Sequence, residues 1–286
     1  RGDALTSTSL RSRAGITLAL VSAATFGTSG SFARSLTEAG WSPEAAVAIR
    51  IGVAAALLAV PAVLAMRGRW QALRTNVRMV AVYGLVAVAG CQVCFFNAVQ
   101  YLPVGVALLL EDLGAVLVVA WLWLRHRIRP RRLTVAGSLV ALTGLVLVLG
   151  VLGGGRIDPV GVLWGLGAAC GLAVFFFLSS RNDVDLPPIA VATAGMLIGT
   201  AILLALGAVG ALRLQATFGT VEFGGHRTTW LVPVVGLALI AAAIAYVTGI
   251  AAARTLGPKL ASFIGLTEVI FAVLVAGVLL GELPTV

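Results

Sequence analysis

The chain has 286 residues, of which 60% are hydrophobic and only 11% are charged. An average soluble chain has about 45–50% apolar and about 25% charged residues, so the composition excludes an ordinary soluble domain and predicts a protein embedded in lipid. The net charge of +9 does not indicate a nucleic-acid partner. The basic residues cluster in short gaps between apolar runs, where they meet anionic lipid headgroups.

Apolar segments long enough to cross a bilayer follow one another along most of the chain, since a helix needs about 20 residues to do so. They predict an all-α polytopic membrane protein with nine spans, at residues 14–36, 43–66, 77–100, 104–124, 132–152, 159–180, 186–212, 230–253 and 258–281. Because the ninth span ends at the outer face, the sequence predicts that a tenth helix is missing after Val286.

The distribution of lysine and arginine predicts the orientation. With the N-terminus inside, the cytoplasmic segments hold 15 of these residues and the outer segments hold 4, as the positive-inside rule requires. In the second half of the chain each side has three, so the orientation there depends on the number of spans. The chain is therefore expected to be a multi-pass protein of the cytoplasmic (inner) membrane.

Two parts of the chain show the same pattern of helices, loops and prolines, and residues 98–130 align with residues 252–284 without gaps. The pattern predicts a first repeat of five helices at 14–152 and a second, incomplete repeat of four helices at 159–286. An odd number of helices per repeat inverts the second copy in the membrane. Inverted repeats are typical of secondary transporters, whose substrate site lies near the midplane between the repeats.

Charged residues inside the predicted spans are few, and such residues usually face a cavity or a partner. Arg50 and Glu111 each lie seven residues from the outer end of a span, about 10 Å deep. They can therefore form a static ion pair or line a substrate path. Glu268 lies about 15 Å deep without an obvious partner, which makes it the candidate carrier of a coupled proton. The role of Asp112 stays open.

Uncharged polar and aromatic residues occur at similar depths, among them Asn97, Trp164 and Tyr246. Each of them alone is typical of helix packing. Together with Arg50, Glu111 and Glu268 they are expected to line the path of an amphipathic small molecule.

The sequence gives little support for a metal site, for redox chemistry or for a bound cofactor. Cys91 and Cys94 have the redox spacing, but they lie within an apolar helix and do not follow a strand. The two histidines, His126 and His226, fall in loops. We therefore expect no metal site and no cofactor.

Two further features are Ser42-Pro43 followed by Arg50, and the segment from Glu268 to Gly281-Glu282. In these features the chain resembles the drug/metabolite transporter superfamily, specifically its EamA-type transporters. The segment Leu110–Ala115 is similar to a signature of the threonine/homoserine exporter branch, with Ala115 in place of a proline. The resemblance implies ten helices in two inverted repeats and the transport of amino acids or other small metabolites.

The predicted function is therefore a secondary transporter that exports or exchanges small metabolites by alternating access, with a small-molecule substrate, the lipid bilayer and a coupled proton as its partners. The alternatives are an intramembrane enzyme and a channel-like pore. An enzyme needs a nucleophile beside a base, and Ser29 in its Gly-Thr-Ser-Gly turn has no histidine within a span. A channel typically has charged rings or a filter loop, and neither is evident.

Overall fold

The protein is almost entirely helical. The computed structural model describes residues 2–127, 129–130, 132–148 and 158–280. The helices of the first half are α1 (Gly2–Gly27), α2 (Ser29–Glu38), α3 (Pro43–Ala65), α4 (Trp70–Thr75), α5 (Val77–Val82), the π-helix η1 (Tyr83–Gly90), α6 (Cys91–Tyr101), α7 (Val104–Glu111), α8 (Leu113–His126) and α9 (Arg132–Val148).

The second half adds one short hairpin to its helices. Its elements are α10 (Pro159–Ser179), α11 (Pro188–Ala208), β1 (Thr220–Phe223), β2 (His226–Thr229), α12 (Leu231–Val235), the π-helix η3 (Gly236–Ile244), α13 (Ala245–Gly265) and α14 (Glu268–Leu280). The all-α membrane class is confirmed by these helices, whereas the hairpin was not predicted. It forms because Gly224 and Gly225 both have positive φ, 61° and 74°, as the tight turn between two antiparallel strands requires.

Seven helical stretches within the described residues are long and apolar enough to cross a membrane. They cover Ser12–Glu38, Pro43–Ala65, Val77–Tyr101, Val104–Arg125, Pro159–Ser179, Pro188–Ala208 and Leu231–Gly265. The predicted span at 132–152 corresponds to α9, which is described for 17 residues, and residues 149–152 lie outside the described part. The apolar stretch Glu268–Val278 is shorter than a full span. The number of nine spans and the presence of a tenth helix after Val286 remain predictions.

Several spanning segments are broken near their middle. The break between α1 and α2 falls at Thr28, and the break between α7 and α8 falls at Asp112. Within α13 the helical path is interrupted at Gly257, which has a φ of 78° that glycine adopts at little cost. The next residue, Pro258, cannot donate a backbone hydrogen bond. Helix ends therefore lie within spanning segments, and the backbone nitrogens of Thr28 and Asp112 are hydrogen-bonded to the preceding turn.

Within the described residues, each half contains one π-helical segment, η1 in the first and η3 in the second. An α-helix resumes directly after each of them, with Gln92 as the second residue of α6 and Tyr246 as the second residue of α13. A π segment changes the direction in which the following side chains point, and such segments are frequent at functional sites.

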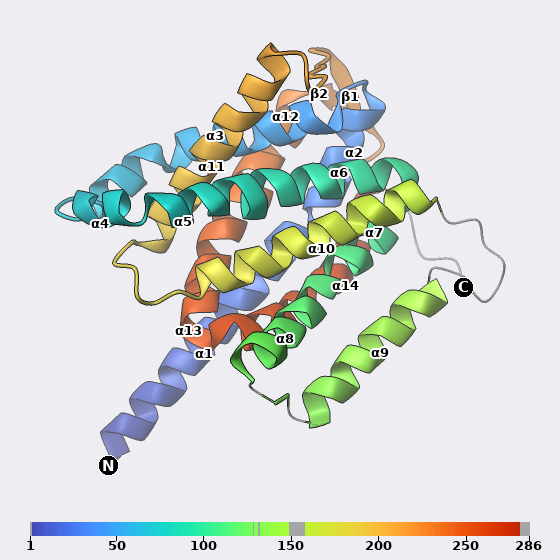
Figure 1. The fold of residues 1–286 in the computed structure, drawn as a ribbon. Helices are drawn as coiled ribbons and strands as arrows, with labels where there is room; N and C mark the ends of the chain where they lie inside the picture. Colours follow the sequence, from blue (N-terminus) through green and yellow to red (C-terminus); the bar gives the residue numbers. More distant parts are fainter. Residues whose placement is uncertain (1, 128, 131, 149–157, 281–286) are drawn as a thin grey trace.

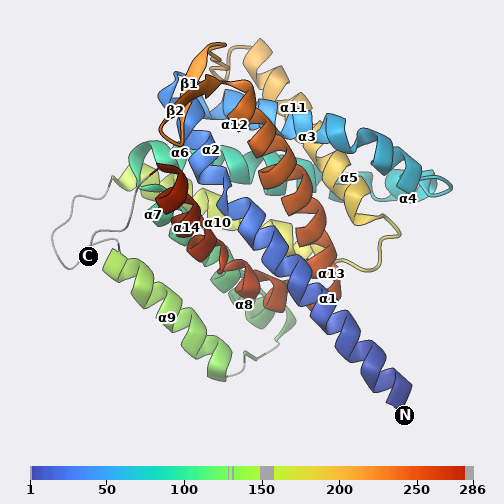
Figure 2. The same ribbon diagram turned by 180° about the vertical axis from the view of Figure 1, so that it is seen from behind.

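Helices of the two halves pack against one another, as Figures 1 and 2 show. The most extensive helix contacts join α1 to α13, α3 to α11 and α6 to α10, and each pair combines one helix from each half. The main hydrophobic core lies between these pairs. The N-terminus and the β1–β2 hairpin lie at opposite ends of the molecule, and α9 lies at its edge (Figure 1).

The start of α3 depends on one serine. Ser42 is the N-cap, and its hydroxyl oxygen accepts hydrogen bonds from the backbone nitrogens of Ala45 and Gln215, both at 3.2 Å. We expect Ser42→Ala to lower the free energy of unfolding by about 1 kcal/mol, measured by thermal unfolding in detergent. Thr143→Ala on the exposed face of α9 is the control and is expected to change stability by less than half as much.

Candidate functional site

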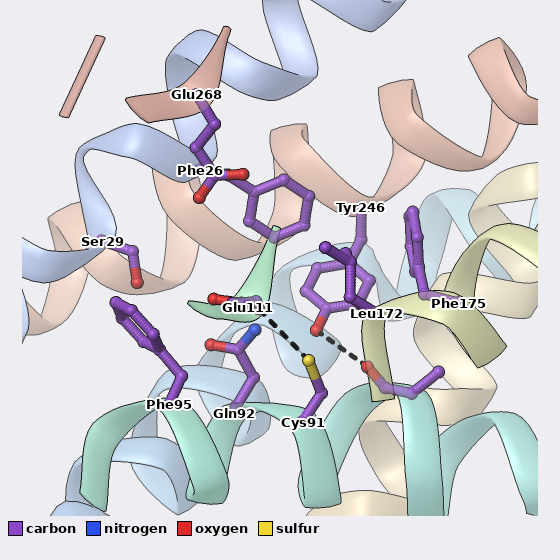
Figure 3. Close-up of a pocket in the computed structure, with 11 residues that line it drawn as sticks. Phe26, Ser29, Cys91, Gln92, Phe95, Glu111, Leu172, Phe175, Tyr246 and Glu268 are labelled. Atoms are coloured by element: carbon purple, nitrogen blue, oxygen red, sulfur yellow. Dashed lines mark hydrogen bonds between the residues drawn. The ribbon is translucent and has the colours of Figure 1, made fainter. Parts of the chain in front are cut away.

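A narrow cavity lies between the two halves, close to the helix breaks. Its volume is about 20 Å³, which is room for about one water molecule. It is lined by Phe26, Ser29, Ala87, Cys91, Gln92, Phe95, Glu111, Leu172, Phe175, Tyr246 and Glu268, and Figure 3 shows how these side chains surround it. We call it the central cavity.

Arg50 of α3 is completely buried beside the central cavity. One terminal nitrogen of its guanidinium donates to the hydroxyl of Ser29, at 3.0 Å, and to the side-chain oxygen of Gln92. The other donates to the backbone carbonyl of Ala241 in η3. The ring of Phe96 lies 5.7 Å from the guanidinium carbon. Arg50 Nε has no hydrogen-bond partner among the described residues.

The structure does not form the ion pair that the depths of Arg50 and Glu111 allow. Within the described part of the chain, no ion pair of 4.0 Å or less includes either residue. The terminal nitrogens of Arg50 are instead occupied by the neutral groups of Ser29, Gln92 and Ala241. A guanidinium held by neutral groups can still pair with a carboxylate that takes their place.

Glu111 is buried at the end of α7 and accepts a hydrogen bond from a cysteine. The Sγ atom of Cys91 lies 3.2 Å from Glu111 Oε1 and 3.3 Å from the backbone oxygen of Ala168 (Figure 3). The sequence analysis interpreted Cys91 as a packing residue. Its spacing with Cys94 gave no sign of this contact, because the partner lies 20 residues away on another helix.

Aromatic side chains form one wall of the central cavity. The ring centroid of Tyr246 lies 5.0 Å from that of Phe26 and 5.6 Å from that of Phe175, both with edge-to-face geometry. The hydroxyl of Tyr246 lies 3.5 Å from the backbone oxygen of Ala87. Phe26 and Phe175 were not among the predicted site residues, because an apolar aromatic in a membrane helix gives no signal that separates a cavity wall from packing.

A second cavity, of about 30 Å³, lies next to the central one. Phe26, Leu172, Phe175 and Glu268 line both cavities. Asp112 lines only the second, and its Oδ2 atom is buried without a hydrogen-bond partner among the described residues. Glu268 thus lines both cavities, whereas the consecutive residues Glu111 and Asp112 line different cavities.

Two predicted site residues lie away from the cavities. The side-chain nitrogen of Asn97 donates to Glu44 Oε1 at 3.0 Å and to the backbone oxygen of Val93 at 2.9 Å. Trp164 is partly buried and packs against the main core. Glu111, Tyr246 and Glu268 do share the central cavity, and Arg50 reaches it through Ser29 and Gln92.

The described residues contain no group of three or more His, Cys, Asp and Glu side chains placed to hold a metal ion. The polar groups available at the cavities are one guanidinium, three carboxyls, an amide, a thiol and hydroxyls. Such a set can bind and exchange protons and small ions or hold a polar ligand.

Comparison with known protein families identifies the family of this chain. The sequence profile of the EamA-like transporter family matches residues 13–150 and again residues 159–286. The chain belongs to the EamA-like transporter family. It is thus a membrane transporter and not an enzyme, and the two EamA matches divide it into two halves. The match does not reach the threonine/homoserine exporter branch, which stays a prediction.

No curated protein matches this EamA chain. Among solved structures, the crystal structure of one protein matches with 23% sequence identity and a TM-score of 0.69, and the alignment covers 98% of this chain and 90% of that chain. At this level of identity the similarity shows the fold alone.

Proposed function

We propose that this EamA protein is a secondary transporter for small zwitterionic metabolites, such as amino acids, and that the substrate binds at the central cavity. The observation that carries the proposal is the distribution of charge there. Arg50, with neutral hydrogen-bond partners only, reaches the cavity through Ser29 and Gln92, and the carboxyls of Glu111 and Glu268 line it. A substrate that carries both a carboxylate and an ammonium group complements both.

Substrate binding requires the central cavity to open. Pockets that hold small ligands usually have about 300–1,000 Å³, far more than the present 20 Å³. Ser29 and Gln92 line the cavity and also bond to Arg50, so a rearrangement of these two side chains would expose the guanidinium to a substrate carboxylate. The breaks at Thr28 and Asp112 are places where the helices can hinge.

The transport cycle that we propose is alternating access between two inverted repeats, at 14–152 and 159–286. The positions of η1 and η3, each followed two residues later by a cavity residue, support a repeat relation. The excess of lysine and arginine in the first three predicted inner segments supports an N-terminus in the cytoplasm and placement in the cytoplasmic membrane.

The test is transport by the purified chain in proteoliposomes. We expect at least one common amino acid to raise the melting temperature in detergent, because a ligand that binds only the folded state stabilises it. The same amino acid is expected to show counterflow into vesicles preloaded with it. A folded protein that transports no amino acid above the level of protein-free vesicles would rule out this substrate class.

A further inference from the structure

The centre of the protein holds more carboxyl groups than cations. Around the two cavities lie one guanidinium, that of Arg50, and the carboxyls of Glu111, Asp112 and Glu268. With all of them ionised, two negative charges have no counter-charge. Charged side chains without partners inside a membrane protein are costly and usually belong to an ion or proton pathway.

Asp112 is the carboxyl that the proposed substrate site leaves without a role. Only 8% of the residue is exposed; it lines the second cavity, and its Oδ2 atom is buried without a hydrogen-bond partner among the described residues. Ser22 and Glu268 are the other hydrogen-bonding side chains that line this cavity. The hydroxyl of Ser22 donates to the backbone oxygen of Ala245 at 2.8 Å, so its oxygen can only accept from a molecule in the cavity.

Glu268 connects the two cavities, which are otherwise separated by Phe26, Leu172 and Phe175. Figure 3 shows Glu268 and Phe26 on the side of the central cavity opposite Gln92 and Cys91. On α1 the second cavity is lined by Ala19, Ser22, Ala23 and Phe26. Because the first three precede Phe26, the second cavity lies on the proposed cytoplasmic side of the central one.

We propose that Asp112 and Glu268 hold one exchangeable proton across the second cavity, and that this pair couples transport to the proton gradient. The inference rests on the proposed transport function. In the transfer, the O–H bond of protonated Glu268 breaks as a water molecule in the cavity takes the proton. The same water gives another of its protons to the Asp112 carboxylate, where a new O–H bond forms. One proton moves, and nothing is oxidised or reduced.

One proton shared by the pair leaves a single uncompensated negative charge around the two cavities. Glu111, Asp112 and Arg50 act electrostatically on Glu268, and Glu111 acts on Asp112. The neighbouring α1 and α10 contribute Ser22 and apolar side chains to the second cavity. Arg254 of α13 donates instead to the backbone oxygen of Leu186. Binding of a substrate ammonium group near Glu111 would change the field at Glu268 and so favour release of the proton, which couples the two cavities.

A proton fits the second cavity better than a metal cation does. The cavity has room for about one water molecule, and apart from Asp112, Glu268 and Ser22 its lining is apolar. A cation that kept its hydration shell would not fit, and the three polar side chains offer few oxygen ligands to replace that shell. A sodium ion is therefore an outcome of the test and not part of the proposal.

The first test observes the proton directly and needs no substrate. Infrared difference spectra of the full chain in nanodiscs, recorded while the pH is changed, report the carbonyl stretch of protonated carboxyl groups. We expect a band that both Asp112→Asn and Glu268→Gln remove or shift. The control Asp185→Asn, at an exposed carboxyl that pairs with Arg69, should leave the band unchanged. A band that survives both cavity substitutions would overturn the proposal.

The second test measures coupling in proteoliposomes, with the amino acid that the counterflow assay identifies. With one coupled proton, a gradient of one pH unit concentrates the substrate up to ~10-fold. We expect Asp112→Asn to abolish this accumulation while counterflow continues, which also shows that the variant folds. Accumulation that persists in Asp112→Asn, or that follows a sodium gradient instead, would contradict the proton site. If the wild-type protein moves no amino acid, the proposed substrate class fails, and the infrared result still decides the proton site.

Discussion

Replacing Arg50 with methionine is expected to reduce amino-acid counterflow by about 100-fold. A charge-assisted hydrogen bond contributes about 1.5–3 kcal/mol, which corresponds to a factor of roughly 10–150 in binding. Methionine is of similar length and apolar, so it fills much of the space of a side chain that is completely buried. Because methionine leaves Ser29, Gln92 and Ala241 without the donor they have in the wild type, a melting curve in detergent is recorded alongside to establish that the variant is folded.

Two further variants make the Arg50 result specific. Arg50→Lys keeps the positive charge but lacks the planar guanidinium that reaches Ser29, Gln92 and Ala241 together, so we expect an intermediate loss. Arg69→Met removes an exposed arginine that pairs with Asp185 at 3.1 Å and should leave counterflow within twofold of the wild-type rate. Wild-type counterflow in Arg50→Met would show that the guanidinium does not bind the substrate.

Replacing Gly84 with valine is expected to have the largest effect on stability, a loss of about 3 kcal/mol. Gly84 lies in η1 against α11, where the two halves meet. A Cβ atom added there would lie 2.6 Å from the backbone oxygen of Gly195 and 2.9 Å from Cβ of Ile198. Because one of these neighbours is backbone, the contact can be relieved only by moving the two helices apart. Glycine permits the close approach, as is common between membrane helices.

Thermal unfolding in one detergent measures this effect, and Gly105→Ala is the matched control. Gly105 lies in α7, and a Cβ atom added there meets no other atom within 4 Å. Alanine favours helix over glycine by up to about 1 kcal/mol, so this variant should be as stable as the wild type or more so. Equal melting temperatures for the two variants would show that the Gly84 contact does not hold the halves together.

The sequence analysis selected part of the candidate site for a simple reason. A charge in a long apolar segment is costly, so Arg50, Glu111 and Glu268 stand out wherever the helices lie. The structure brings two of them, with Tyr246, to one cavity. Asn97 does not join them, because it lies two residues after the cavity residue Phe95, on another face of α6, and meets Glu44 instead.

Sequence patterns could not predict the hydrogen-bond partners of these residues. Arg50 faces Ser29, 21 residues earlier, and Ala241, 191 residues later. The helical periodicity that assigns residues to faces assumes regular α-helix, whereas η1 and η3 change the direction of Gln92 and Tyr246 just before the site. Consecutive residues lie about 100° apart on a helix, so the sequence predicts that Glu111 and Asp112 point in different directions, and they line different cavities.

Composition and apolar length by themselves determined that this chain is a helical membrane protein with a few costly charges in its spans, since the bilayer imposes both helix length and the scarcity of charge. The tertiary structure alone decided which carboxyl meets which cavity and which groups hold Arg50. These contacts arise where helices of different halves cross at glycines and where single helices are interrupted. Both features depend on the packing of neighbouring helices and not on the residues of one helix alone.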